Sequence, residues 1–366
     1  MNQDFILGRL SEIMGWDTDR SRQEFDWLRL MSRMKYDGYQ DFLAGMRFIE
    51  SLADWLQQFT QHEREAAYRL VRDSLIYIST AEMNHLVELF YPETVQWRLQ
   101  NAVAARLGIS PYRVWAVEES AKLYRRLLRQ TLFVELSDGA RIDVFRRANA
   151  GMISNEQVIT APRVNDDKWA DLIKDLRGDL KDGEAKFSSV FLIDDFIGSG
   201  TTLLRKEDGK WKGKLARFRD DVQRFLGTHF EEGWTLNVHH YIGSHMAQRV
   251  VHERQSLALA EYGEGKWFNN VQFSFGTILP VDTPITKTSH PAFIELTRSY
   301  YDKSIETKHT EVGGIGARLG FGGCALPLIL EHNTPNNSVA LLWAETQGKE
   351  GRHAMRPLFR RRQRHV

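Results

Sequence analysis

The stretch that decides the fold runs from Val190 to Leu204 and reads VFLIDDFIGSGTTLL. Its first four residues are apolar and predict a buried strand, which ends in two carboxylates, Asp194 and Asp195. Glycines and hydroxyl side chains follow in the loop Ile197, Gly198, Ser199, Gly200, Thr201 and Thr202. The amides and hydroxyls of this loop can donate to phosphate oxygens, and a helix N-terminus behind it would add its dipole. Since open α/β sheets bind ligands beyond the carboxyl ends of their strands, we expect a binding site here.

This order of residues predicts a site for a phosphorylated sugar. Asp194 and Asp195 would accept hydrogen bonds from vicinal ribose hydroxyls, and the loop would hold the 5′-phosphate. The stretch has neither the Gly-Lys-Ser/Thr of a P-loop nor the Gly-x-Gly-x-x-Gly of dinucleotide-binding folds. A solvated acidic turn is the alternative, and the apolar strand directly before the acid pair favours the binding site.

Short apolar runs continue on both sides of this stretch and alternate with helical segments. The clearest are Leu132–Leu136, Leu236–Ile242 and Ala325–Leu330, and their spacing predicts a parallel sheet with both faces covered. Ser137, Asp138 and Gly139 could form a hairpin turn or a strand-to-helix loop. The i, i+3 spacing of Ile142 and Phe145 favours the loop, with a helix over 140–148.

The first third of the chain has helical periodicity from Gln23 to about Gln130. We therefore predict an all-helical domain over 1–130, an α/β domain over 131–350 and a basic tail over 351–366. Within the helical part, Ala104–Ser110 resembles the turn of a helix-turn-helix, although an ordinary helix corner is the favoured interpretation. A basic stripe follows at helical spacing, formed by Lys122, Arg125, Arg126 and Arg129.

Composition narrows the class of protein. The chain has 366 residues, enough for two domains, and 42% of them are hydrophobic, enough for a core. Its single cysteine, Cys324, excludes a disulfide framework and a multi-thiolate metal site, and gives little reason to expect a nucleophile. Without a signal-peptide core or a membrane-spanning run, we expect a soluble cytoplasmic protein with no membrane contact. The oligomeric state is open.

The net charge of +1 hides an uneven distribution. No acidic residue follows Glu350, so the chain before that point is net acidic. Contact of the tail with phosphate or nucleic acid is one interpretation, and a solvated disordered terminus is the commoner one. The positive charge of the tail comes from six arginines: Arg352, Arg356, Arg360, Arg361, Arg362 and Arg364.

The central stretch resembles the phosphoribosyl pyrophosphate (PRPP) motif of the type I phosphoribosyltransferases. Asp194, Asp195, Ser199, Gly200 and Thr202 occupy the motif positions after an apolar strand. The resemblance implies a Rossmann-type parallel sheet that binds PRPP or a ribonucleotide, a mobile hood over 149–166, and a Mg²⁺ ion carried by the substrate with no direct protein ligand. It also implies a pyrophosphate loop, whose place is taken by Ser137, Asp138 and Gly139, with Arg141 just inside the next helix. The loop itself lacks the Lys or Arg that the family often has there.

More narrowly, the region from Leu132 to Arg360 is similar to a divergent phosphoribosyltransferase-like group found in bacterial antiphage systems, including retrons. The similarity rests on the central stretch, on EHNTPNNS at 331–338, on Leu342-Trp343 and on Pro357–Phe359. It implies a toxin effector, an enzyme that transfers or hydrolyses at a nucleotide glycosidic bond, with a reverse transcriptase and its RNA/DNA product as partners. A catalytically inactive nucleotide-sensing module and a nucleic-acid-binding partner protein are the alternatives.

Two further groups of residues are candidates. His332, Asn333, Asn336 and Asn337 follow an apolar run and could hydrogen-bond a base or acceptor, or could simply form an Asx-type turn. His239 and His240 have no carboxylate at metal-ligand spacing, so we expect them to lie in or beside a strand.

Overall fold

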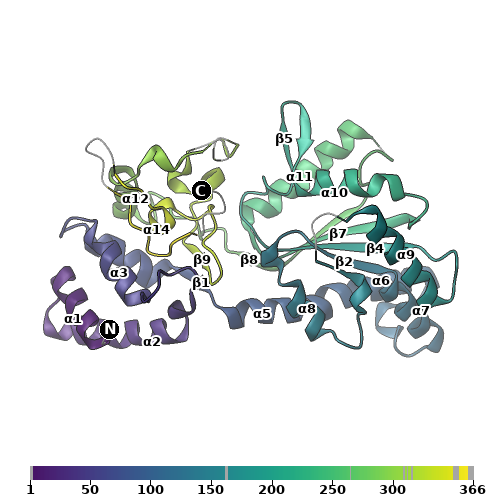
Figure 1. The fold of residues 1–366 in the computed structure, drawn as a ribbon, viewed down its shortest axis with the longest axis horizontal. Coiled ribbons are helices and arrows are strands. Elements are labelled where there is room, and N and C mark those ends of the chain that lie inside the picture. Colours follow the sequence, from purple (N-terminus) through teal and green to yellow (C-terminus); the bar gives the residue numbers. More distant parts are fainter. Residues whose placement is uncertain are drawn as a thin grey trace. The chain divides into compact units, whose positions relative to one another are not determined.

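The structure is a computed structural model, and it describes residues 3–160, 164–263, 265–307, 310, 312–314, 316–348 and 354–361. The chain forms two compact units (Figure 1). Unit 1 comprises 1–82 together with 280–366, and unit 2 comprises 83–279. Among the described residues, no helix has both the length and the apolar character needed to cross a membrane.

Unit 2 contains a five-stranded parallel sheet in the order β3-β2-β4-β7-β8. Its strands are β2 (Thr131–Glu135), β3 (Val158–Ile159), β4 (Phe187–Ile197), β7 (Phe230–Ser244) and β8 (Val271–Leu279). Its main helices are α6 (Gln96–Leu107), α7 (Glu118–Arg129), α8 (Ile142–Ala148), α9 (Asp166–Leu180), α10 (Lys214–Val222) and α11 (His245–Tyr262), and α5 (Thr80–Leu89) leads into the unit. The predicted α/β fold with a parallel sheet is confirmed.

Both faces of this sheet are covered because successive side chains of each strand point to opposite faces. Leu192 belongs to a core shared with α9, α10 and α11. Phe191, next to it in β4, contacts Phe90 and Phe133 on the other face. Figure 1 shows α10 and α11 on one side of the strands and α8 on the other. The apolar runs of the sequence are therefore strands buried on two sides.

The segment after β2 follows the strand-to-helix interpretation. A 3-10 turn, η5 (Asp138–Ala140), leads into α8, and the next strand, β3, lies parallel to β2 rather than antiparallel. The corner at Gly108 is an ordinary helix end, since Gly108 has φ +65° and caps α6. The basic stripe on α7 forms ion pairs within unit 2: Arg126 with Asp182 and Arg129 with Asp179.

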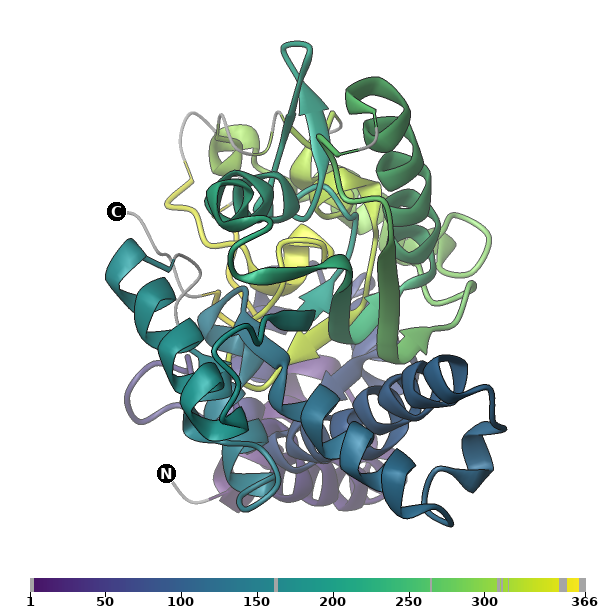
Figure 2. The same cartoon turned by 90° about the vertical axis from the view of Figure 1, so that its right-hand side faces the viewer.

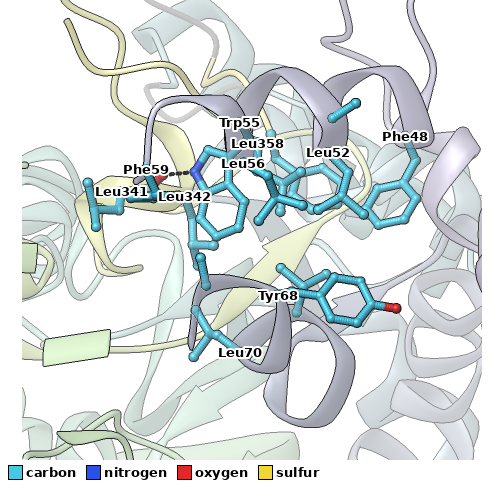
Figure 3. Close-up of a cluster of buried hydrophobic side chains, with 14 of the residues drawn as sticks. Phe48, Leu52, Trp55, Leu56, Phe59, Tyr68, Leu70, Leu341, Leu342 and Leu358 are labelled. Carbon is cyan, nitrogen blue, oxygen red and sulfur yellow. Dashed lines mark hydrogen bonds between the residues drawn. The ribbon is translucent and has the colours of Figure 1, made fainter. Parts of the chain in front are cut away.

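Unit 1 joins the two ends of the chain. It comprises α1 (Gln3–Met14), α2 (Thr18–Met34), α3 (Phe48–Gln57), α4 (Arg64–Arg69), β1 (Ile76–Ile78), α12 (Pro291–Ser299), β9 (Leu328–Leu330) and α14 (Ala340–Trp343). The Trp55 indole donates to the carbonyl of Leu341 at 2.7 Å, and Leu358 is buried in the same cluster (Figure 3). A core made from residues this distant in sequence fixes the unit only when both segments are present.

This division differs from the predicted one. Residues 83–130 do not belong with the N-terminal helices, because Phe90 stacks on His239 of β7 with a centroid distance of 4.2 Å and covers the sheet. The run Ala325–Leu330 does not enter the main sheet, because its strand β9 pairs with β1 in unit 1. Helical periodicity and apolar runs identify elements but do not identify their packing partners.

The described part of the basic tail packs against unit 1. Leu358 and Phe359 are fully buried, Arg360 pairs with Glu345 at 2.9 Å, and the Arg361 guanidinium lies over the Trp343 ring. A solvated disordered terminus is therefore wrong for residues 354–361, since their apolar side chains belong to a core. Other parts of the predicted tail lie outside the described residues, among them Arg352, Arg362 and Arg364.

Candidate functional site

The candidate site lies where the strand order of unit 2 reverses. The chain leaves β2 for β3 on one side and then reaches β4 on the other side, so the crevice between β2 and β4 is the topological switch point. The loops after these two strands meet there, because the Leu136 amide donates to the carbonyl of Ile193 at 2.8 Å and the Ser137 hydroxyl donates to the Asp194 carboxylate. Residues 137–141 and 194–202 thus form one site.

Asp194 is the most buried acid of this site, with 4% of its surface exposed. It accepts hydrogen bonds from Ser137 and from the ammonium group of Lys214, with which it forms an ion pair. Burial raises the pKa of Asp194, Lys214 opposes the rise, and Asp195 adds to it. The Asp195 amide donates to the Asp194 carboxylate as well, at 3.3 Å, so three donors of the protein hold this buried carboxylate and leave it less capacity for a ligand.

Asp195 occupies the other face of β4 and is only half-buried. Its side chain accepts from the amide of Phe196 at 2.8 Å. Its charge acts on Tyr241 and on Arg141: burial raises the pKa of Tyr241 and Asp195 adds to that rise, whereas burial lowers the pKa of Arg141 and Asp195 opposes it. Of the two acids, Asp195 is therefore the more accessible to a ligand.

The loop from 197 to 202 takes its shape from α11. Ser244 donates to the carbonyl of Gly198, and its hydroxyl also accepts from the Ala247 amide and so caps α11. Gly200 has φ +75°, and a Cβ there would lie 3.2 Å from Val250. The Arg254 guanidinium donates to the carbonyl of Leu204 at 2.8 Å. The loop therefore rests against the first turns of a helix.

No helix follows this loop directly. The chain turns instead into a hairpin, β5 (Arg205–Glu207) and β6 (Lys210–Lys212), and α10 begins only at Lys214. The hairpin projects from unit 2 (Figures 1 and 2). It returns to the loop because the Lys214 amide donates to the carbonyl of Thr202 at 3.0 Å and Gly213 packs on the carbonyl of Leu203. The first residue of α10 is thereby brought beside Asp194.

Lys214 is the residue of this site that the sequence did not reveal. It lies 20 residues from Asp194, beyond the hairpin, in no motif. Its side chain is 16% exposed, and it places a cation beside Asp194. The sequence could indicate the place of Lys214 only through Gly213, which ends the connection before it, and a glycine does not specify a contact with Asp194.

The segment predicted as the pyrophosphate loop lies in unit 2 and contains one residue with a strained backbone. Arg141 has φ +47°, unusual for a residue other than glycine, and its guanidinium donates to Asn84 at 2.9 Å. Asp138 and Gly139 form the 3-10 turn η5. Strain of this kind is found at binding sites more often than elsewhere. Among the described residues, no group of three or more His, Cys, Asp and Glu side chains is arranged to hold a metal ion.

The residues from 332 to 337 belong to unit 1, not to the unit with the switch point. The Asn337 amide donates to the carbonyl of Phe321 at 3.0 Å, and the carbonyl of Asn336 accepts from the Phe321 amide. His332 contacts the buried Glu331, and the Asn333 amide donates to the carbonyl of Leu330. Asn333 and Asn336 contribute main-chain atoms to these bonds, and the Asn337 side chain donates to a residue 16 positions away, so none of these bonds is an Asx-type turn.

Three further side chains have the environments that their sequence context indicated. Burial raises the pKa of the Cys324 thiol to about 11, which disfavours a reactive thiolate. His239 and His240 lie in β7, as expected, with His240 directly opposite Asp194 in the ladder. Burial lowers the pKa of His240 to about 3, so this imidazole is neutral at physiological pH.

A comparison with protein families finds one match, to the family model described as PRTase-CE, over residues 52–361. The matched segment contains both loops of the switch point and most of unit 1. Searches of curated proteins and of solved structures find no match to this chain.

Proposed function

The chain belongs to the PRTase-CE family of phosphoribosyltransferase-like proteins, and from this membership we propose that unit 2 binds PRPP or a ribonucleotide at its switch point. The observation that supports the proposal is the meeting of the acid pair and the glycine-hydroxyl loop at one crevice. A phosphorylated ribose needs acceptors for its hydroxyls and donors for its phosphate, and the two sets lie on consecutive residues of one strand and its loop.

Each part of the ligand has a counterpart in this proposal. The hydroxyls of Ser199, Thr201 and Thr202 and the loop amides would hold the 5′-phosphate. Asp195 would accept from the ribose hydroxyls, while Asp194, already bonded to Ser137 and Lys214, would position Lys214 toward the ligand's negative charge.

The residues present fit a magnesium ion that arrives with the ligand. Burial raises the pKa of Glu135, and the nearby charges of Asp138 and Asp194 add to the rise, so this edge of the sheet carries a surplus of carboxylates. A divalent cation relieves such a surplus, and Asp138 and Asp195 would be its nearest protein groups. When bound, magnesium supplies charge neutralisation for the pyrophosphate.

The reaction that this site would support is substitution at the ribose C1 atom. The bond from C1 to the pyrophosphate oxygen, or to the base nitrogen of a ribonucleotide, breaks, and its electron pair leaves with that group. A bond to C1 forms from an acceptor nitrogen or from water, which gives up one proton. Catalysis would rest on positioning and on charge stabilisation. In a cell, consumption of nucleotides by this route would make the protein a toxin effector of antiphage defence, in a retron if it is encoded beside a reverse transcriptase.

A second candidate function is a nucleotide sensor without catalysis. The Asp194–Lys214 ion pair favours it, because a carboxylate neutralised within the protein contributes less charge to a transition state. In that case the site binds its ligand and the protein responds by a change of partner.

The experiment that tests the proposal measures PRPP and ribose 5-phosphate binding to the full chain by calorimetry. We expect Asp195→Asn to weaken binding by about tenfold or more, the value of a lost charge-assisted hydrogen bond. Asp171→Asn, on an exposed position of α9, is the matched control. Equal binding by all three proteins would contradict the proposed site. Release of pyrophosphate or free base then separates the enzyme from the sensor.

A further inference from the structure

A second cavity of unit 2 lies at the opposite edge of its sheet. It has a volume of about 750 Å³ and lies between α6 and the first residues of three strands, with Ser189 of β4, Thr235 of β7 and Gln272 of β8 in its lining. Because the strands are parallel, their amino ends lie at the edge away from Asp194–Thr202. The volume falls within the range of small-molecule sites.

Two arginines line this cavity, Arg98 and Arg106, and Arg106 is paired with Glu231. The Arg98 guanidinium donates to the Asn237 side chain, to the carbonyl of Gln272 at 3.3 Å and to that of Phe273 at 3.2 Å. All three acceptors are neutral, and among the described residues no carboxylate forms an ion pair with Arg98. Burial lowers the pKa of Arg98 to about 10, which shows how poorly its charge is solvated. An anion beside it would restore the missing countercharge.

Donors remain available in the same lining. A guanidinium has five N–H groups, and three of those on Arg98 are used by the protein. Within the part of the chain that the structure describes, its Nε has no hydrogen-bond partner, and this atom is not fully buried. Ser189 accepts from Asn237 at 2.9 Å and from Thr235 at 3.2 Å, which leaves its own proton to donate. Nε–H and this hydroxyl can together bind an oxyanion.

The other residues that line the cavity restrict the shape and the charge of the rest of the ligand. Trp97, which is 55% exposed, offers an indole surface against which a planar ring can pack. Glu93 and Glu232 are exposed at the cavity, and Glu231 is already paired with Arg106 at 3.0 Å. These acids repel ligands of high negative charge, such as polyphosphates and nucleic acids.

We propose that this cavity is a second ligand site, which binds a small molecule carrying a carboxylate or a phosphate on a planar ring, with Arg98 and Ser189 on the oxyanion and Trp97 against the ring. The site is independent of the PRPP site, since the two lie at opposite edges of the sheet. It shares strands β4 and β7 with that site, so a ligand here contacts the same strands whose far ends carry Asp194 and His240.

The test titrates the full chain with benzoate and with phenyl phosphate, and with neutral benzamide as the matched control. Calorimetry gives affinities, and the Nε–H NMR signal of Arg98, assigned through Arg98→Lys, reports the site directly. We expect a shift of this signal with one or both anions and about tenfold weaker binding of benzamide. A preference for benzoate identifies a carboxylate ligand, and a preference for phenyl phosphate identifies a phosphate ester.

Variants distinguish this site from the PRPP site. Ser189→Ala should weaken anion binding, and it leaves the hydrogen bonds of Arg98 in place, so the fold is preserved. Asp195→Asn should leave anion binding at this cavity unchanged. Absence of any Nε–H shift with both anions at millimolar concentration, or equal shifts with benzamide, would overturn the proposal. PRPP binding that is lost while benzoate binding persists would contradict only the proposed function.

Discussion

At the scale of single residues, Asp194 and Lys214 form a buried ion pair at the switch point. Both side chains are largely buried, so their attraction is weakly screened, and removal of one partner leaves the other as an uncompensated charge. The pair therefore couples the stability of unit 2 to the protonation of one carboxyl group.

Lys214→Met should lower the free energy of unfolding by about 3–5 kcal/mol at neutral pH, the typical cost of breaking a buried ion pair from one side. Without Lys214, the pKa of Asp194 rises further above its ordinary value of 3.8. A carboxyl whose pKa is raised on folding makes the protein most stable at low pH, and that stability falls as pH rises from 3.8 through the raised pKa. Urea unfolding across this range measures both effects.

Lys214→Arg keeps the charge and is the control for this experiment. Addition of Asp194→Asn to Lys214→Met should remove the extra pH dependence, because the titrating group is gone. A stability loss in Lys214→Met that does not vary with pH would show that packing, and not charge, holds the pair together.

The site was predictable from the sequence only where it is local. Asp194, Asp195 and the loop to Thr202 are consecutive, so one apolar strand and one motif sufficed to place them together. Lys214 joins them through a hairpin, and Ser137 through the pairing of β2 with β4. Contacts of that kind depend on register and on side-chain direction, which periodicity does not report.

At the scale of elements, the β5–β6 hairpin connects the loop 197–202 to Lys214 of α10. Its closing residue, Gly213, has φ +121°, and a Cβ there would collide with the carbonyl of Leu203. The close contact of Gly213 with Leu203 therefore fixes where the hairpin ends and where Lys214 begins α10.

Gly213→Ala should displace Lys214 from Asp194 and weaken PRPP binding, with a loss of stability of about 1–3 kcal/mol from the strained backbone. Calorimetry and thermal unfolding measure the two effects. Gly209→Ala is the matched control, because Gly209 also has a positive φ, +73°, yet nothing lies within 4 Å of a Cβ there. If both variants bind PRPP equally, the collision at Leu203 has no effect on the site.

The strands themselves were predictable to different degrees. β2 and β4 are buried on both faces and contain continuous apolar runs, and β7 is buried from Leu236 onward although Asn237, His239 and His240 interrupt its run. β8 has only one neighbour and alternates with exposed positions such as Gln272 and Gly276, so no such run marks it. β9 was visible as an apolar run, but its partner β1 is a three-residue strand within a helical region.

At the scale of the whole molecule, unit 2 is an insertion between the two segments of unit 1. Its core is made from its own residues, including the helices before β2 that cover the Phe191 face of the sheet. The boundary that matters for folding therefore lies near Met83 rather than near Gln130.

A fragment of residues 83–279 should fold alone, unfold cooperatively in urea and bind PRPP as the full chain does. A fragment of residues 131–350 should expose the face around Phe191 and lack cooperative unfolding, because the helices that cover that face are absent. Circular dichroism during urea unfolding compares the two. If the 131–350 fragment unfolds cooperatively and the 83–279 fragment does not, the domain boundary lies near Gln130.

The insertion of unit 2 also sets an order of events during synthesis. Residues 83–279 emerge from the ribosome as a complete folding unit, whereas α3 of unit 1 must wait for Leu341 and Leu358 to be translated. A nascent chain therefore contains all of unit 2, with its proposed ligand site, before its N-terminal helices have a core. Translation that stops early yields a protein with an intact switch point and an exposed apolar surface, which chaperones and proteases recognise.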